Sequence, residues 1–153
     1  MKYMSTLIAV KDMQKSKQFY HDILDLEVVS DLGANVTLTG GFALQSMDTW
    51  QYFIGGKDVS LQNNAVELVF EEEDMDAFLE HLRKFDIEYV HDTVEHSWGQ
   101  RVIRFYDLDG HIIEVGADMK MVIKRFLATG MTMEEVSVKM DASVEDLTKL
   151  LNS

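Results

Sequence analysis

The sequence predicts an α+β fold of two βαβββ modules that form a cup-shaped mixed sheet, followed by a C-terminal helical extension. Short apolar runs and one amphipathic helix occur twice in the same order, with Asp12-Met13 and Asp74-Met75 offset by 62 residues. After residue 118 the pattern becomes wholly helical. One module cannot bury both faces of its sheet, so we expect two to close a curved sheet around a cleft.

The first module is expected at residues 1–50. Asp12 is the expected N-cap of its helix, because an aspartate before an apolar-periodic run accepts hydrogen bonds from the first free N–H groups. Gly40-Gly41 predicts a hairpin turn. The strands are expected at 4–10, 26–30, 35–39 and 42–47. Residues 51–63, which contain Gly55-Gly56, predict a linker.

The second module is expected at residues 64–117. Asp74 is its expected helix cap, in the position that Asp12 holds in the first copy. Asp107-Leu108-Asp109-Gly110 predicts a turn between the last two strands. The strands are expected at 65–71, 87–91, 101–106 and 111–116.

The helical extension is expected at residues 118–153. Thr132 and Glu135 predict a capping box, Gly130 a helix end, and Ser143 the start of a third helix. Three short helices are also compatible with a helix-turn-helix, but residues 119–153 are charge-neutral and lack the basic face that DNA binding needs. We therefore favour a helical cap or a dimer contact.

The composition limits the classes of function. The chain has 153 residues and a net charge of -13, and residues 64–118 carry fifteen acidic but only four basic side chains. Such a surface repels phosphate backbones, so nucleic-acid binding is disfavoured. The absence of cysteine excludes disulfides and thiolate metal sites. With no apolar run of about 18 residues and no leader pattern, we expect neither a membrane span nor a signal peptide, and a cytoplasmic protein.

Residues 4–117 resemble the glyoxalase I / bleomycin-resistance / extradiol-dioxygenase group, the vicinal-oxygen-chelate superfamily. The resemblance rests on two segments: Leu7 to Met13 with Phe19-Tyr20 behind it, and Arg104 to Glu114. Leu108 stands where the family turn usually has proline. The resemblance implies paired modules, a small-molecule ligand and a homodimer. In metal-using members, the first and last strands of each module each give one ligand to a divalent ion.

The four family ligand positions fall on Ser5, Gln45, Glu67 and Glu114, and only Glu114 matches the commonest pattern. Strand alternation supports the placement of Glu67, because its apolar neighbours Val66, Leu68 and Phe70 would occupy the opposite face. The tentative metal set is thus Glu67, Glu114 and Gln45, with Ser5 at the fourth position.

Chemistry leaves three alternatives open for these carboxylates. Two carboxylates, an amide and a hydroxyl suit Mg or Mn, whereas Zn and Ni usually take imidazole or thiolate ligands, so a divalent metal (Mn, Mg, Ni or Zn) is a candidate cofactor. Without an ion, two close carboxylates would share a proton as a general acid/base pair. Alternatively, Glu67 simply pairs with Arg101 or Arg104.

Candidate substrate-binding residues are Trp98, Arg101, His96 and Trp50. A tryptophan beside glycine, followed by arginine, offers a flat stacking surface and an anion-pairing group. A packed loop anchor is the alternative for Trp98.

The function favoured by the resemblance is a glyoxalase-like small-molecule enzyme. It would transfer a proton in isomerase or lyase chemistry on a vicinal-oxygen substrate, with Glu114 as base or ligand and Glu67 as its partner. The alternative is a metal-free binding protein of the bleomycin-resistance type, which sequesters a compound. The substrate itself is beyond the sequence, because this fold hosts many chemistries.

Overall fold

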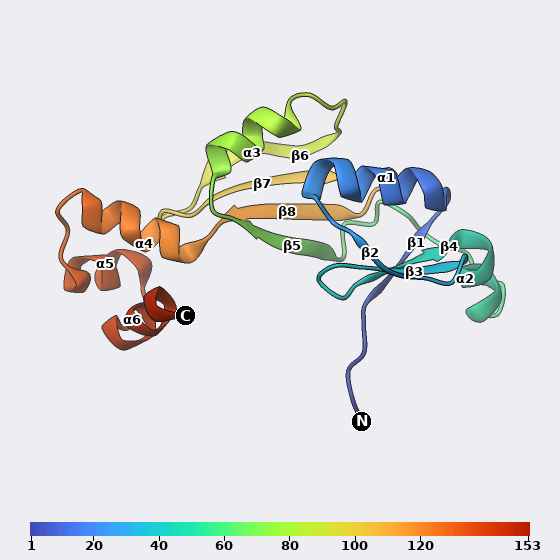
Figure 1. The fold of residues 1–153 in the computed structure, drawn as a ribbon, viewed down its shortest axis with the longest axis horizontal. Helices are drawn as coiled ribbons and strands as arrows, with labels where there is room; N and C mark the ends of the chain where they lie inside the picture. The colour runs from blue at the N-terminus through green and yellow to red at the C-terminus, as the bar shows by residue number, and fades with distance from the viewer. The chain divides into compact units, whose positions relative to one another are not determined.

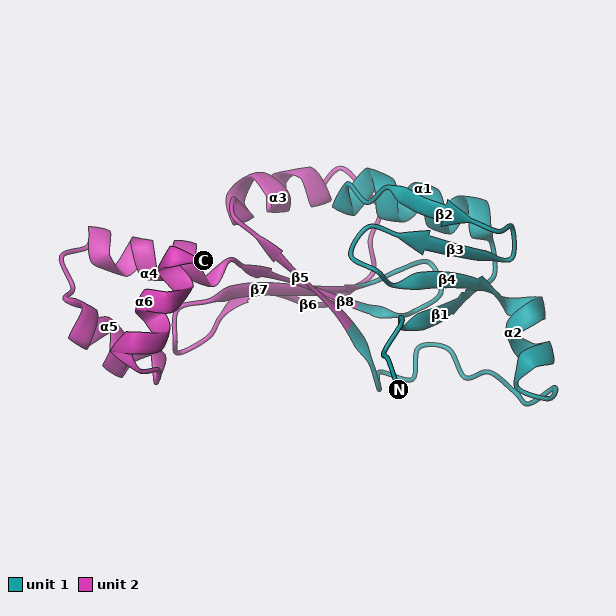
Figure 2. Cartoon of the chain, turned by 60° about the horizontal axis from the view of Figure 1, so that its bottom comes forward, with its two compact units in different colours: residues 1–67, 106–112 teal, residues 68–105, 113–153 magenta.

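The computed structural model describes residues 1–153, which divide into two compact units (Figure 2). Unit 1 comprises residues 1–67 and 106–112, and unit 2 comprises residues 68–105 and 113–153. None of the helices combines the length and the apolar composition that crossing a membrane requires.

Unit 1 contains a four-stranded mixed sheet in the order β1-β4-β3-β2 (Figure 1). The edge strand β1 pairs parallel with β4, and β3 pairs antiparallel with both β4 and β2. The strands are β1 (Leu7–Val10), β2 (Val28–Asp31), β3 (Asn35–Leu38) and β4 (Ala43–Ser46). This is a complete βαβββ module, as the sequence predicts.

Helix α1 (Met13–Leu24) buries its apolar face in the core of unit 1. Asp12 caps the helix by accepting from the backbone N–H of Lys15, and Asp25 ends it in the left-handed conformation. Tyr20 is fully buried and meets Phe42, the residue before β4, edge-on, with ring centroids 5.3 Å apart. Packing against the sheet, rather than helix propensity alone, holds a helix of this length.

The turn between β7 and β8 belongs to unit 1 and is held there by a buried carboxylate. Asp107, only 7% exposed, accepts hydrogen bonds from the Tyr20 hydroxyl and from the backbone N–H groups of Asp109 and His111, and its Oδ2 lies 2.9 Å from Nδ1 of His111. Asp109 in turn accepts from the backbone N–H of Lys11. Both aspartates of the turn are therefore structural anchors.

The second module has the same strand order as the first, β5-β8-β7-β6. Its strands are β5 (Glu67–Glu72), β6 (Tyr89–Glu95), β7 (Arg101–Tyr106) and β8 (Ile112–Ala117). Its helix α3 (Met75–Leu82) begins at Asp74, which accepts from the backbone N–H of Ala77 just as Asp12 does in α1. The predicted duplication, and with it the α+β fold of two βαβββ modules, is confirmed.

The extension consists of α4 (Met119–Ala128), α5 (Met133–Met140) and α6 (Val144–Asn152). Asp118 caps α4, Thr132 and Glu135 form the predicted capping box of α5, and Ser143 caps α6. The helices share a small core of their own, which is built by Val122, Ile123, Phe126, Val136, Met140 and Leu147.

Helix α2 (Met47–Phe53) is the one element that the sequence analysis missed. It carries Trp50 and extends three residues into the stretch 51–63 that was predicted as a linker. Its N-cap Ser46 makes no side-chain capping bond. A seven-residue helix with no buried residue leaves little apolar periodicity to recognise.

The loop between β6 and β7 is joined to α4 at Gly99. Arg125 of α4 donates from Nη2 to the carbonyl oxygen of Gly99 (2.5 Å) and to Glu95 (3.1 Å). Gly99 has a φ of +87° and lies against Phe126, so a Cβ there would be 2.2 Å from the Phe126 Cζ atom. Glycine is thus required for both conformation and space.

We expect Gly99→Ala to destabilise the protein by about 1 to 3 kcal/mol more than Gly130→Ala, because only the first adds a clash to the backbone strain. Gly130 also has a positive φ, +93°, but a Cβ there would meet no atom within 4 Å. Urea unfolding of both variants measures the difference. Equal losses of unfolding free energy in the two variants would show that Phe126 of α4 does not pack tightly against Gly99.

We expect the stabilising effect of Asp107 to disappear in acid. Burial by itself raises the pKa of Asp107, but the hydrogen bonds and the charge of His111 outweigh it and hold the pKa below the ordinary 3.8. A depressed pKa stabilises the fold above the ordinary value, and that stability is lost as the pH falls through the folded-state pKa. Asp107→Asn should therefore cost about 1 to 3 kcal/mol at pH 7.

The difference between wild type and Asp107→Asn should shrink as the pH falls below 3.8. Asp109 acts in the opposite direction, because burial raises its pKa and its contribution falls as the pH rises. Urea unfolding between pH 3 and pH 7 follows the difference. A difference that does not change with pH would contradict the buried, ionised Asp107.

Candidate functional site

Glu114 of β8 lies at the centre of a polar group on the sheet of unit 2. Arg104 of β7 donates from Nη2 to a carboxylate oxygen of Glu114, and its Nη1 lies 3.3 Å from Nε2 of His91 on β6. The side chains of Glu114 and Arg104 are 12% and 25% exposed. Three neighbouring strands thus bring an acid, a guanidinium and an imidazole together in a half-buried environment.

Strand alternation explains why these side chains meet. Gly116 lies against Gln100, since a Cβ on Gly116 would be 2.9 Å from the Gln100 Nε2 atom. Gln100 and Arg104 therefore share the face that Glu114 and Gly116 occupy. The opposite face consists of the buried side chains Ile103, Phe105, Ile113 and Val115.

Glu67 lines a pocket of about 300 Å³ in unit 1. The pocket is formed with Asn64, Ala65, Val66 and Ile112. Along β5, Leu68 and Phe70 are half-buried whereas Glu67 is exposed, as the predicted alternation requires. Val66 differs from the expectation: it is 64% exposed, because it precedes the strand and is not held by the sheet.

Gln45 and Ser5 already use their polar atoms within unit 1. Gln45 is buried, its Oε1 accepts from Asn35 (2.9 Å), and its Nε2 donates to the hydroxyl of Thr49. The Ser5 hydroxyl donates to the carbonyl oxygen of Gly41 (2.7 Å). Both side chains therefore have structural roles at the ends of β4 and β1.

The four positions fit a divalent ion poorly. None is a histidine, the Gln45 oxygen already accepts a hydrogen bond, and the charge of Glu114 is balanced by Arg104. A cation at Glu114 would have to displace a guanidinium in direct contact. The convergence of Glu67 with Glu114 involves residues of different units and stays a prediction.

Three of the four candidate substrate-binding residues lie in unit 2, and Trp50 lies in unit 1. His96 and Trp98 stack, with ring centroids 4.2 Å apart and planes 15° apart, and Trp98 remains 37% exposed. Arg101 donates to Asp76 of α3 (2.6 Å), so it lies on the opposite face of β7 from Arg104. Trp50 is half-buried on α2 of unit 1.

The sequence analysis did not identify Arg104 as the partner of Glu114, or His91 as the neighbour of Arg104. Alternation on β7 could have indicated the face of Arg104, but the partner depends on register between strands. A second group, His21, Asp25 and Glu27, has ligand atoms within 4.8 Å of one another. All three are exposed, and exposed groups of this kind are common without an ion.

The family model described as a glyoxalase-like domain matches residues 3–120. The chain belongs to the glyoxalase-like domain family. This places it in the vicinal-oxygen-chelate superfamily, as the two sequence segments predict. The match ends at residue 120, so most of the helical extension of this glyoxalase-like protein lies outside the family domain.

Solved structures agree with the family. A protein of unknown function from Agrobacterium tumefaciens str. C58 is 34% identical, with a TM-score of 0.69 over 76% of this chain and 94% of the other. A lactoylglutathione lyase from the same species is 20% identical, with a TM-score of 0.61 over 77% and 94%.

A glyoxalase/bleomycin resistance protein/dioxygenase from Nocardioides is 19% identical, with a TM-score of 0.61 over 76% and 83%. No curated protein gives a significant match.

We expect Arg104→Gln to lower the free energy of unfolding by about 1.5 to 3 kcal/mol, because Glu114 loses a charged partner in a half-buried site. Arg101→Gln is the matched control. Its partner Asp76 is 81% exposed, so its loss should be smaller. Urea unfolding compares the two, and a double-mutant cycle with Glu114→Gln isolates the coupling. Zero coupling would contradict the pair.

Proposed function

We propose that this glyoxalase-like protein binds a small organic molecule at the Glu114 face without a divalent ion, in the manner of bleomycin-resistance proteins. The observation that carries the proposal is the state of the four family ligand positions. Gln45 and Ser5 are engaged in hydrogen bonds, and Arg104 neutralises Glu114. In each unit, the polar groups at these positions already have partners, which favours a metal-free role that recognises a ligand through hydrogen bonds.

The polar group itself offers the means of recognition. Arg104 supplies N–H donors, Glu114 supplies acceptors, and His91 can do either according to its tautomer. Because Glu114 is only 12% exposed, bonds to a ligand there would compete with little bulk water. The stacked His96 and Trp98 are the proposed aromatic contacts, and Glu67 and Trp50 remain proposed ligand contacts.

A second candidate is proton-transfer catalysis of the glyoxalase type, and the contact between Arg104 and Glu114 favours it. Glu114 would remove a proton next to a carbonyl group, with Glu67 as the second acid/base. Arg104 would stabilise the negative charge that develops on the carbonyl oxygen. This reaction would use Glu114 and Arg104 on the same face of the sheet as the binding proposal, and it would not require a metal ion.

We also propose that the protein is a homodimer and that it is cytoplasmic, as the sequence predicts. Family membership supports the dimer, whereas the location rests on composition alone.

We expect the protein to retain no stoichiometric Mn, Mg, Ni or Zn after purification, because Arg104 occupies the carboxylate that a cation would need. Elemental analysis and thermal shift with each chloride salt measure this. Glu114→Gln is the control for nonspecific binding to the acidic surface. A metal-induced rise in melting temperature that disappears in Glu114→Gln would contradict the metal-free site.

Assay of lactoylglutathione lyase activity distinguishes the two candidates. The binding proposal expects no turnover with or without added metal. Turnover that requires Glu114 and Arg104 would instead establish the proton-transfer candidate.

A further inference from the structure

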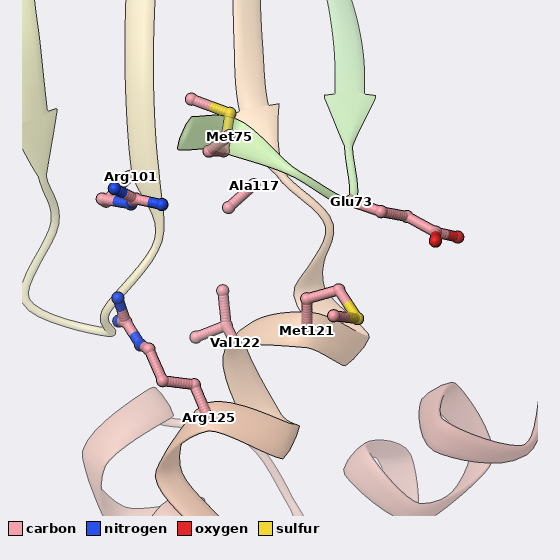
Figure 3. A pocket seen from close by; sticks show the side chains of 7 residues that line it. All are labelled: Glu73, Met75, Arg101, Ala117, Met121, Val122 and Arg125. Carbon is pink, nitrogen blue, oxygen red and sulfur yellow. The ribbon is translucent and has the colours of Figure 1, made fainter. Parts of the chain in front are cut away.

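A second pocket, of about 190 Å³, lies between α4 and the sheet of unit 2 (Figure 3). It opens on the face of β7 that carries Arg101, opposite the face of Glu114, and is therefore separate from the site described above. Its lining residues are Glu73, Met75, Arg101, Ala117, Met121, Val122 and Arg125. The last three belong to α4, beyond the family domain.

Two guanidinium groups form one side of this pocket. Arg101 and Arg125 lie on the same side of the view in Figure 3, whereas the carboxylate of Glu73 points away from them. Arg101 bonds Asp76 through Nη1, and Arg125 bonds Glu95 and the Gly99 carbonyl through Nη2. Each guanidinium thus engages one terminal nitrogen and retains further N–H groups.

The remaining walls are apolar. Met75 and Val122 are each 2% exposed, and Ala117 lines the pocket with them. A water molecule occupies about 30 Å³ of liquid, so the pocket has room for roughly six waters, which corresponds to a molecule of about six to ten non-hydrogen atoms. Because the pocket has a positively charged side and apolar walls, a ligand of this size should have an anionic end and an apolar end.

We propose that this pocket binds a small aliphatic monocarboxylate. The ligand carboxylate would take the open N–H groups of Arg101 and Arg125, and its chain would contact Met75 and Val122. Asp76 is 81% exposed and Glu95 is 48% exposed, and such surface pairs contribute little. A ligand that also buries apolar surface can therefore compete with them for the two guanidinium groups.

The net charge of the chain disfavours ligands that carry more than one negative charge. With a net charge of -13 on the chain, each additional anionic group adds repulsion. Binding would also link α4 to the module, since the ligand contacts both and stabilises the docked arrangement by mass action.

The test uses butanoate as the probe and butanamide as its neutral counterpart, on the full chain. In amide NMR spectra, butanoate should give saturable shifts at Arg101, Ala117, Val122 and Arg125, with a dissociation constant on the order of 1 mM. Butanamide should give at least tenfold weaker binding. Equal binding of the two, or no saturable shift with butanoate, would overturn the proposal.

Three variants make the test independent of stability. Arg125→Gln should weaken butanoate binding at least tenfold, whereas Arg83→Gln, at the exposed end of α3, should not change it. Asp76→Asn removes the competing carboxylate and should tighten binding several-fold, an effect that misfolding cannot produce. Unchanged or weaker binding in Asp76→Asn would refute the role of Arg101.

Discussion

The buried carboxylate of Asp107 is the interaction on which the rest of the structure depends. Its two oxygens lie within hydrogen-bond distance of the Tyr20 hydroxyl, two backbone N–H groups and the His111 ring. A buried charge is tolerated only when it is satisfied in this way. Burial and Asp107 together raise the pKa of Tyr20 well above its usual value, which keeps that hydroxyl a donor. The turn between β7 and β8 is thereby fixed against α1.

The position of this turn determines which side chains of β7 and β8 lie on each face of the sheet. The turn sets where β7 ends and where β8 begins, and alternation then assigns each side chain of the two strands to a face. Glu114 and Arg104 fall on the face where they meet, while Arg101 falls on the face of α3. A shift of one residue in either strand would exchange these faces and dismantle both the polar group and the second pocket.

Residues of the extension, which lie beyond the family domain, line a pocket on one face of the second module. Arg125 reaches from α4 to the Gly99 carbonyl, and Gly99 leaves room for Phe126. Arg125 also lines the second pocket, together with Arg101. The extension is therefore part of a candidate binding surface, and its own core of apolar side chains gives α4 a stable support.

The sequence by itself determined the local structure. The caps Asp12, Asp74 and Thr132 follow from patterns within a few residues, and the duplication follows from the same pattern recurring 62 residues later. The sequence analysis did not predict helix α2, because this helix lacks a buried apolar face. Only the tertiary structure decided the partners, such as Arg104 for Glu114 and Asp76 for Arg101. The physical reason is that a local pattern fixes the direction of a side chain, whereas its partner depends on register and packing between segments far apart in the chain.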